Sequence, residues 1–141
     1  MGQEITQTHF NEETFKVYER RLSDEAELLQ TQLSEGRFSD IGDIGGYELE
    51  SWLVDHNYFP SPINQPFLTR LNNPLVVPEL SRFNVELNGA PLPLQGNVLS
   101  ALARELGQNW QQCQDVAHAM DSVLMMVGIL PTVRQADLCL A

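Results

Sequence analysis

The chain has little positive charge. Of its 141 residues, eight are lysine or arginine and nineteen are aspartate or glutamate, which gives a formal net charge of −11 at pH 7. Lys16 is the only lysine. Such a chain repels the phosphate backbone of nucleic acid and is weakly drawn to anionic membrane surfaces. We therefore expect neither nucleic acid nor a membrane as a partner.

Long hydrophobic runs and targeting signals are also missing. The longest apolar run, Val123–Leu130, is far shorter than the ~20 residues that cross a bilayer. The first residues lack the basic region and apolar core of a secretory signal. Cys113 and Cys139 form no CxxC pair, so free thiols are expected. These absences predict a cytoplasmic protein without disulfides.

Apolar residues make up 43% of the chain, enough for a folded core. The charge pattern separates residues 1–40 from residues 41–141, because the first segment alone holds nine of the acids. Asn11 is a candidate N-cap and Gly36 a stop signal for a helix between them. Its apolar residues recur every three or four positions: Phe15, Tyr18, Leu22, Ala26, Leu29 and Leu33. We expect an amphipathic acidic helix whose other side meets solvent.

The remainder predicts an α+β fold with a largely antiparallel sheet flanked by helices. Strands are expected at residues 47–55, 75–77 and 82–88, with a short edge strand at 67–69. Residues 122–130 fit a buried strand, with an extension of the preceding helix as the alternative. A long helix starts after Asn97, and its apolar stripe is Leu99, Leu102, Leu106, Trp110, Cys113, Ala117 and Met120. If the sheet is unfinished, its exposed edge favours self-association.

Four carboxylates fall among the strands. Glu48 and Glu50 emerge on one face of their strand, ~6–7 Å apart. Glu86 lies in a Val-Glu-Leu strand, and Glu79 precedes it by an odd number of positions. In a continuous strand Glu79 and Glu86 would therefore point to opposite faces. The turn at residues 78–81 must break the register if the two are to converge.

Converging carboxylates repel one another by about 3 kcal/mol per pair at ~6 Å and an effective dielectric near 20. A divalent cation such as Mg²⁺ or Mn²⁺ would neutralise them, and Mg²⁺ commonly joins one or two carboxylates to substrate phosphates. The alternative interpretation is a polar sheet face that meets solvent. Spacing alone leaves both open.

Three motifs resemble the glutamate–cysteine ligase family, in particular its bacterial carboxylate–amine ligase branch. They are residues 45–55 (GGYELESWLVD), residues 78–88 (PELSRFNVELN) and residues 128–132 (GILPT). The family opens its catalytic domain with a Gly-x-Glu-x-Glu strand, follows with a second acidic pair and has a Gly-x-x-Pro turn after a long helix. The resemblance covers about residues 43–132.

The resemblance implies a glutamine-synthetase-like sheet that carries metal-bound ATP, with an acyl phosphate formed from glutamate and an amide bond made by an amine. Carried over by position, Glu48, Glu50, Glu86 and Glu79 would ligate Mg²⁺ or Mn²⁺. Family members are much longer, so we expect this chain to be the N-terminal portion of such a ligase and inactive alone. The alternative is a non-enzymatic α+β interaction module.

Other residues give weaker signals. His9, His56 and His118 share no metal-ligand spacing, and the glycines at 42, 45 and 46 do not form a phosphate-binding loop. His56 is expected on a surface loop and His118 half-buried on a helix. Cys113 falls on the apolar stripe and is expected in the core.

Overall fold

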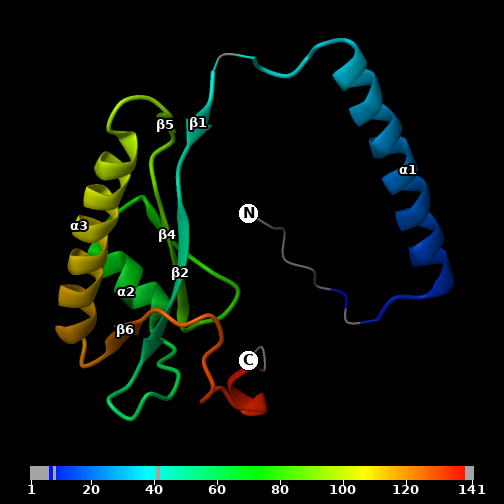
Figure 1. Ribbon diagram of the computed structural model, residues 1–141. Helices are drawn as coiled ribbons and strands as arrows, with labels where there is room; N and C mark the ends of the chain where they lie inside the picture. The colour runs from blue at the N-terminus through cyan, green and yellow to red at the C-terminus, as the bar shows by residue number, and fades with distance from the viewer. Residues whose placement is uncertain (1–6, 8, 41, 139–141) are drawn as a thin grey trace. The chain divides into compact units, whose positions relative to one another are not determined.

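The computed structural model describes residues 7, 9–40 and 42–138 (Figure 1). The chain divides into two compact units, residues 1–41 and residues 42–141. The first unit contains one helix, α1 (Glu12–Ser34). The second contains two antiparallel sheets, helices α2 (Asn64–Leu71) and α3 (Val98–His118), and a short 3₁₀ helix, η1 (Gln135–Leu138). This is an α+β fold, as expected.

Helix α1 begins and ends where the sequence predicts. The Asn11 side chain accepts a hydrogen bond from the Thr14 amide at 2.9 Å, which satisfies one free N–H of the first turn. At the other end Gly36 takes a positive φ of 64°. The Gly36 amide donates to Leu33 and the Arg37 amide to Gln32, which is the Schellman arrangement that glycine permits.

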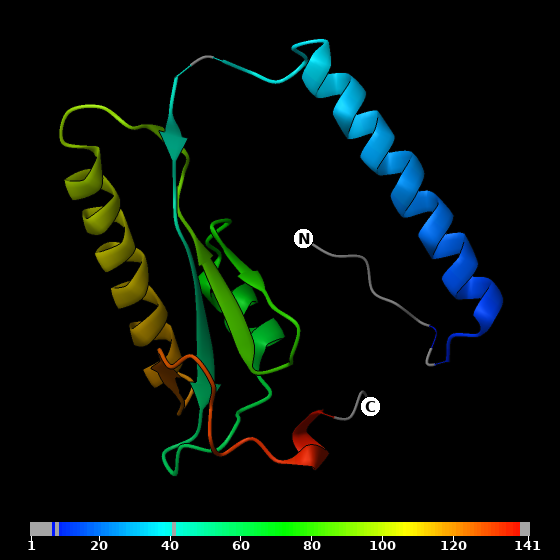
Figure 2. The same ribbon diagram turned by 45° about the vertical axis from the view of Figure 1, so that its right-hand side comes forward.

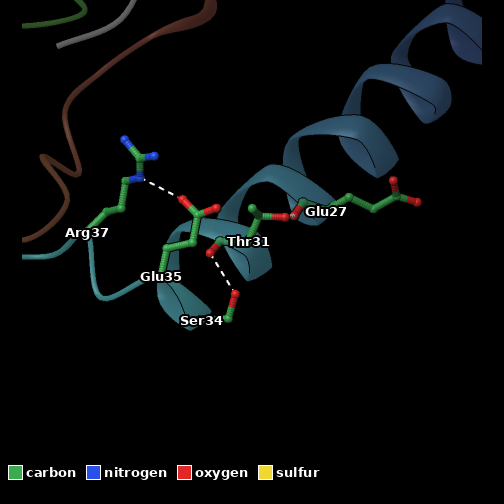
Figure 3. A network of polar contacts seen from close by, with 5 residues as sticks. All are labelled: Glu27, Thr31, Ser34, Glu35 and Arg37. Carbon is green, nitrogen blue, oxygen red and sulfur yellow. Dashed lines mark hydrogen bonds and ion pairs between the residues drawn. The ribbon is translucent and has the colours of Figure 1, made fainter.

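Polar side chains in the last turns of α1 and just after it interact with residues close to them in the sequence (Figure 3). Thr31 Oγ1 donates to the carbonyl of Glu27 at 2.9 Å, and Ser34 Oγ to that of Thr31 at 2.8 Å. Arg37 Nε and Glu35 Oε2 form an ion pair at 2.7 Å. No residue of α1 is buried. Within its own unit, α1 therefore has no packing that covers its apolar stripe.

The main sheet of the second unit has the order β3-β4-β2-β6, with every neighbouring pair antiparallel. Its strands are β2 (Glu48–Val54), β3 (Val76–Pro78), β4 (Asn84–Asn88) and β6 (Val123–Met125). A separate small sheet pairs β1 (Ile44–Gly45) with β5 (Leu92–Pro93). Both edges of the main sheet are three-residue strands, and β3 ends in a proline that cannot donate to a ladder.

The core lies between the main sheet and helices α2 and α3, which cover one of its faces (Figures 1 and 2). Alternate residues of the strands point into it, so Leu49, Ser51 and Leu53 of β2 share this face, and Glu48 and Glu50 share the other, as strand alternation predicts for the two glutamates. The buried cluster is Leu53, Phe67, Val76, Val85, Leu87, Cys113, Ala117 and Leu124. This packing fixes the strand register, because a slip by one residue would turn the glutamates inward.

The opposite face carries Glu48, Glu50, Trp52 and Val54 of β2. At its Trp52 end the segment after β6, orange in Figure 2, contributes a contact: the Trp52 indole N–H donates to the Val127 carbonyl at 2.9 Å. The Trp52 ring also stacks on Phe83 with centroids 5.8 Å apart. The Glu48 end of this face has no such cover, since Glu48 and Glu50 are exposed.

Two expected strands are wrong in type or length. Residues 67–69 lie in α2, whose first turn accommodates Pro66 because the N–H groups there need no helical partner. The strand expected over residues 122–130 is only Val123–Met125. Pairing ends at Met125, opposite Trp52, and the Val127 carbonyl two residues further on accepts the indole N–H of Trp52.

Helix α3 has the expected extent, with two corrections. Asn97 is its N-cap, but its side chain makes no capping hydrogen bond. Leu99, at the start of the stripe, is 74% exposed, whereas Leu102, Cys113 and Ala117 are buried. The apolar stripe therefore reaches the core only from the second turn onward. Within the described residues, no helix is both long and apolar enough to cross a membrane.

Candidate functional site

The face of β2 and β4 that points away from α2 and α3 brings two of the predicted metal ligands directly opposite each other. Glu50 of β2 pairs in register with Glu86 of β4, and Glu48 pairs with Asn88. Glu48 and Glu50 follow one another on the same face of β2, about 7 Å apart along the strand. Three of the four predicted carboxylates thus share one patch of sheet, which we call the acidic face (Glu48, Glu50, Glu86).

The hydrogen-bond ladder places Glu50 and Glu86 in the closer kind of antiparallel pair. The amide of Leu53 donates to Phe83 and the amide of Gly89 to Tyr47, so the bonded pairs of β2 and β4 occur at odd positions. Glu50 and Glu86 therefore form a non-hydrogen-bonded pair, in which opposed Cα atoms are typically about 4.5 Å apart. Like charges directly opposite on a sheet are destabilising.

Glu79 reaches the same face through the β3–β4 hairpin. Val77 is opposite Glu86, and the Glu79 amide donates to the Asn84 carbonyl at 3.5 Å, which continues the ladder by one pair beyond the strand. Residues 77 and 79 alternate in phase, so Glu79 lies on the side of Glu86. The turn before Asn84 supplies the break in register that the sequence required. Glu79 is half-buried and lies on the β3 side of Glu86.

Ion pairs do not neutralise these carboxylates. In the described part of the chain, the ion pairs are Arg37–Glu35, His56–Asp121 and Arg134–Asp137. Among the same residues no group of three or more His, Cys, Asp or Glu side chains is arranged to hold a metal ion. The acidic face therefore offers a pair of carboxylates with a third nearby, rather than a preformed cage.

An open depression of about 400 Å³ adjoins the Glu48 end of the acidic face. Its lining residues are Gly46, Tyr47, Glu48, Asn88, Gly89 and Pro91. The Tyr47 ring lies against Gly89 so closely that a Cβ there would be 2.5 Å from ring carbons. Glycine is therefore required at 89 for the ring to form this wall.

Tyr47 is held by a polar network that sequence reasoning missed. Its hydroxyl donates to Glu105 Oε1 at 3.2 Å and accepts from Asn109 Nδ2 at 3.4 Å. Glu105 Oε1 also accepts from the Ala90 amide at 3.1 Å. The pKa of the Tyr47 hydroxyl is raised above its ordinary value, chiefly by burial. The hydrogen bond from Asn109 lowers this pKa, and the carboxylate of Glu105 raises it. The only signal in the sequence was a polar residue, Asn109, beside the apolar stripe of α3.

The remaining candidates lie elsewhere. His56 is exposed, as expected, and its Nε2 is 3.0 Å from Asp121 Oδ1. His118 is exposed rather than half-buried, because α3 turns it away from the core. Cys113 is fully buried, and burial raises the pKa of its thiol to about 12. Cys139 lies outside the described residues.

Comparison with known proteins gives no match, since no protein-family model, curated protein or solved structure is significantly similar to this chain. Membership of the glutamate–cysteine ligase family therefore stays a prediction that rests on the three motifs.

Proposed function

We propose that residues 42–141 form the metal- and nucleotide-binding portion of an ATP-dependent carboxylate–amine ligase of the glutamate–cysteine type. The observation that carries this proposal is the opposition of Glu50 and Glu86 on the sheet face that points away from α2 and α3. Both residues occupy the positions that the family resemblance assigns to metal ligands.

The donor set fits a cation that arrives with a phosphate. Mg²⁺ prefers oxygen ligands and is commonly held by one or two carboxylates together with substrate phosphates and water. A pair of opposed glutamates meets that requirement without a third protein ligand. A divalent cation held by the two glutamates would also lower the repulsion between their carboxylates. Glu48 and Glu79 would extend the site along β2 and along the hairpin.

In the proposed reaction a carboxylate oxygen of glutamate attacks the γ-phosphorus of ATP and ADP leaves. The amine nitrogen of the second substrate then attacks the acyl carbon, and inorganic phosphate leaves as the amide bond forms. A cation at the acidic face would supply charge neutralisation at the phosphate oxygens. Glu50 and Glu86 would hold it, and the adjoining depression walled by Tyr47 would receive part of a substrate.

The second unit offers few groups for the rest of a nucleotide. It contains no lysine, and its arginines are Arg70, Arg82, Arg104 and Arg134. Arg70 donates to the Ala119 carbonyl, and Arg134 lies over the Phe59 ring at 4.4 Å. We therefore propose that residues 42–141 bind metal–ATP but do not complete the reaction alone.

Thermal melting of the full 141-residue chain tests the proposal. Wild type, Glu50→Gln and a control, Asp115→Asn, are melted with chelator, Mg²⁺ or Mn²⁺, each with and without ATP. Asp115 is an exposed carboxylate on α3, away from the acidic face. A ligand at a hundred times its dissociation constant adds about 2.7 kcal/mol, which raises the melting temperature of a domain of this size by several degrees.

We expect metal with ATP to raise the melting temperature of wild type and of Asp115→Asn but not of Glu50→Gln. An equal rise in all three proteins would place the binding away from Glu50 and contradict the proposal. No rise in wild type would also contradict it, and would favour the non-enzymatic interaction module.

A further inference from the structure

Helix α1 carries an apolar stripe that nothing in the described part of its own unit covers. Its residues are half or more exposed where they are large: Phe15 61%, Tyr18 64%, Leu22 52%, Leu29 50% and Leu33 61%. In proteins most of the stability of a helix comes from tertiary packing of its amphipathic face rather than from intrinsic helix propensity. We therefore expect a packing partner that covers the stripe and stabilises α1.

The stripe repeats every eleven residues. Phe15, Tyr18 and Leu22 are followed at this interval by Ala26, Leu29 and Leu33. Eleven residues span three turns at 3.67 residues per turn, so the stripe runs almost straight along the helix and suits a second helix packed along it. Phe15 and Leu33 are equally far from residue 24, as are Leu22 and Ala26, so a two-fold axis near residue 24 would bring these positions opposite each other.

All three bases of α1 lie in its first half. Residues 12–22 hold three bases (Lys16, Arg20 and Arg21) and three acids (Glu12, Glu13 and Glu19), whereas residues 23–34 hold three acids and no base (Asp24, Glu25 and Glu27). A parallel pair of such helices would set the two acidic second halves against each other. An antiparallel pair sets the bases of each copy against the acidic half of the other.

We propose that α1 is a self-association element that pairs with α1 of a second copy of this chain in antiparallel orientation. Residue 15 lies near residue 33 of the other copy, and residue 22 near residue 26. Two-fold symmetry makes each contact occur twice. The proposal does not depend on the ligase function, because the acidic face belongs to the other unit.

One flank of the stripe makes the orientation testable. Arg21 and Glu25 project from the same flank, and like flanks meet in an antiparallel pair. With the axis near residue 24, Arg21 of one copy lies within about two residues, or 3 Å along the axis, of the position opposite Glu25 of the other. Neither side chain forms an ion pair among the described residues. An arginine side chain spans such an offset.

Sedimentation equilibrium of the full chain from micromolar to hundreds of micromolar measures the association. We expect a monomer–dimer equilibrium. Leu29→Glu places a charge in the stripe and should raise the dissociation constant at least about tenfold. Leu28→Glu is the matched control, because Leu28 is as exposed (56%) but lies off the stripe. It should change the constant less than about twofold.

Charge exchange tests the orientation. Arg21→Glu alone and Glu25→Arg alone should each dimerise more weakly, since each sets like charges across the axis twice. An equimolar mixture of the two variants should recover wild-type association through heterodimers. Mixing cannot repair charge effects within one helix, so recovery reports contact between copies. A chain that is monomeric throughout, equal effects of Leu28→Glu and Leu29→Glu, or no recovery in the mixture would each overturn the proposal.

Discussion

Glu50 and Glu86 owe their opposition to packing on the other side of the sheet. Leu49, Leu53, Val85 and Leu87 must face the helices, and that requirement sets the register in which the two glutamates meet. The sequence predicted the shared face of Glu48 and Glu50 from strand alternation. It did not predict that Glu50 lies directly opposite Glu86, because register between strands depends on the hairpins and the core.

Without metal, the opposed pair is expected to cost stability. Glu50→Gln and Glu86→Gln should each raise the free energy of unfolding in chelator by about 0.2–1 kcal/mol at low salt. The double variant should gain less than the sum, because either change alone removes the repulsion. Urea unfolding at low and high salt measures all four proteins. Fully additive gains would show that the two carboxylates do not interact.

Cys113 should be chemically inert in the folded protein. Burial raises the pKa of its thiol to about 12 from 9.0, so the reactive thiolate is scarce at pH 8 and inaccessible to reagents. In a Cys139→Ser background, a thiol reagent should label Cys113 only after unfolding in guanidinium. Rapid labelling of the folded protein would contradict its burial.

The raised pKa of the Cys113 thiol also predicts how the free energy of unfolding depends on pH. The unfolded chain releases the thiol proton above about pH 9 while the folded chain keeps it until about pH 12. The unfolded state then binds fewer protons, so the contribution of Cys113 is full below pH 9 and is lost as pH rises from 9 to 12. Cys113→Ala should flatten this part of the stability profile relative to its parent.

At the scale of elements, Tyr47 and Gly89 join the start of β2 to the end of β4. Gly89→Ala should lower the free energy of unfolding by about 1–3 kcal/mol, because the new methyl group overlaps the Tyr47 ring. Gly107→Ala is the control: a Cβ there meets nothing within 4 Å, and the residue lies inside α3. That change should stabilise by about 0.5–1 kcal/mol. Destabilisation of equal size in both would remove the steric explanation.

The elements that the sequence predicted well are those with strong local signals. Asn11 and Gly36 bracket α1 through capping geometry, and alternation defines β2. The strand expected at residues 67–69 is wrong because the Pro- and Asn-rich stretch before it already belongs to a helix, with Pro66 in the first turn of α2. The β1–β5 pair has almost no periodic signal in two-residue strands, so only tertiary structure defines it.

At the scale of the whole molecule, the buried core belongs entirely to residues 42–141. Removing residues 1–41 should change the melting temperature of the remainder by less than about 4 °C, corresponding to under 1 kcal/mol. Circular dichroism should lose the helical signal of α1, and sedimentation should show loss of the dimer. A much larger drop in melting temperature would mean that α1 supports the core.

The two tryptophans lie on opposite sides of the main sheet, so the fluorescence of each reports on one side. Trp110 of α3 packs against the core, whereas Trp52 stacks on Phe83 and bonds to Val127 on the other side. In Trp110→Phe, fluorescence would come from Trp52 alone, two positions along β2 from Glu50. Paramagnetic Mn²⁺ bound at the acidic face should quench that emission, while Trp52→Phe would leave a signal that reports unfolding of the core and little else.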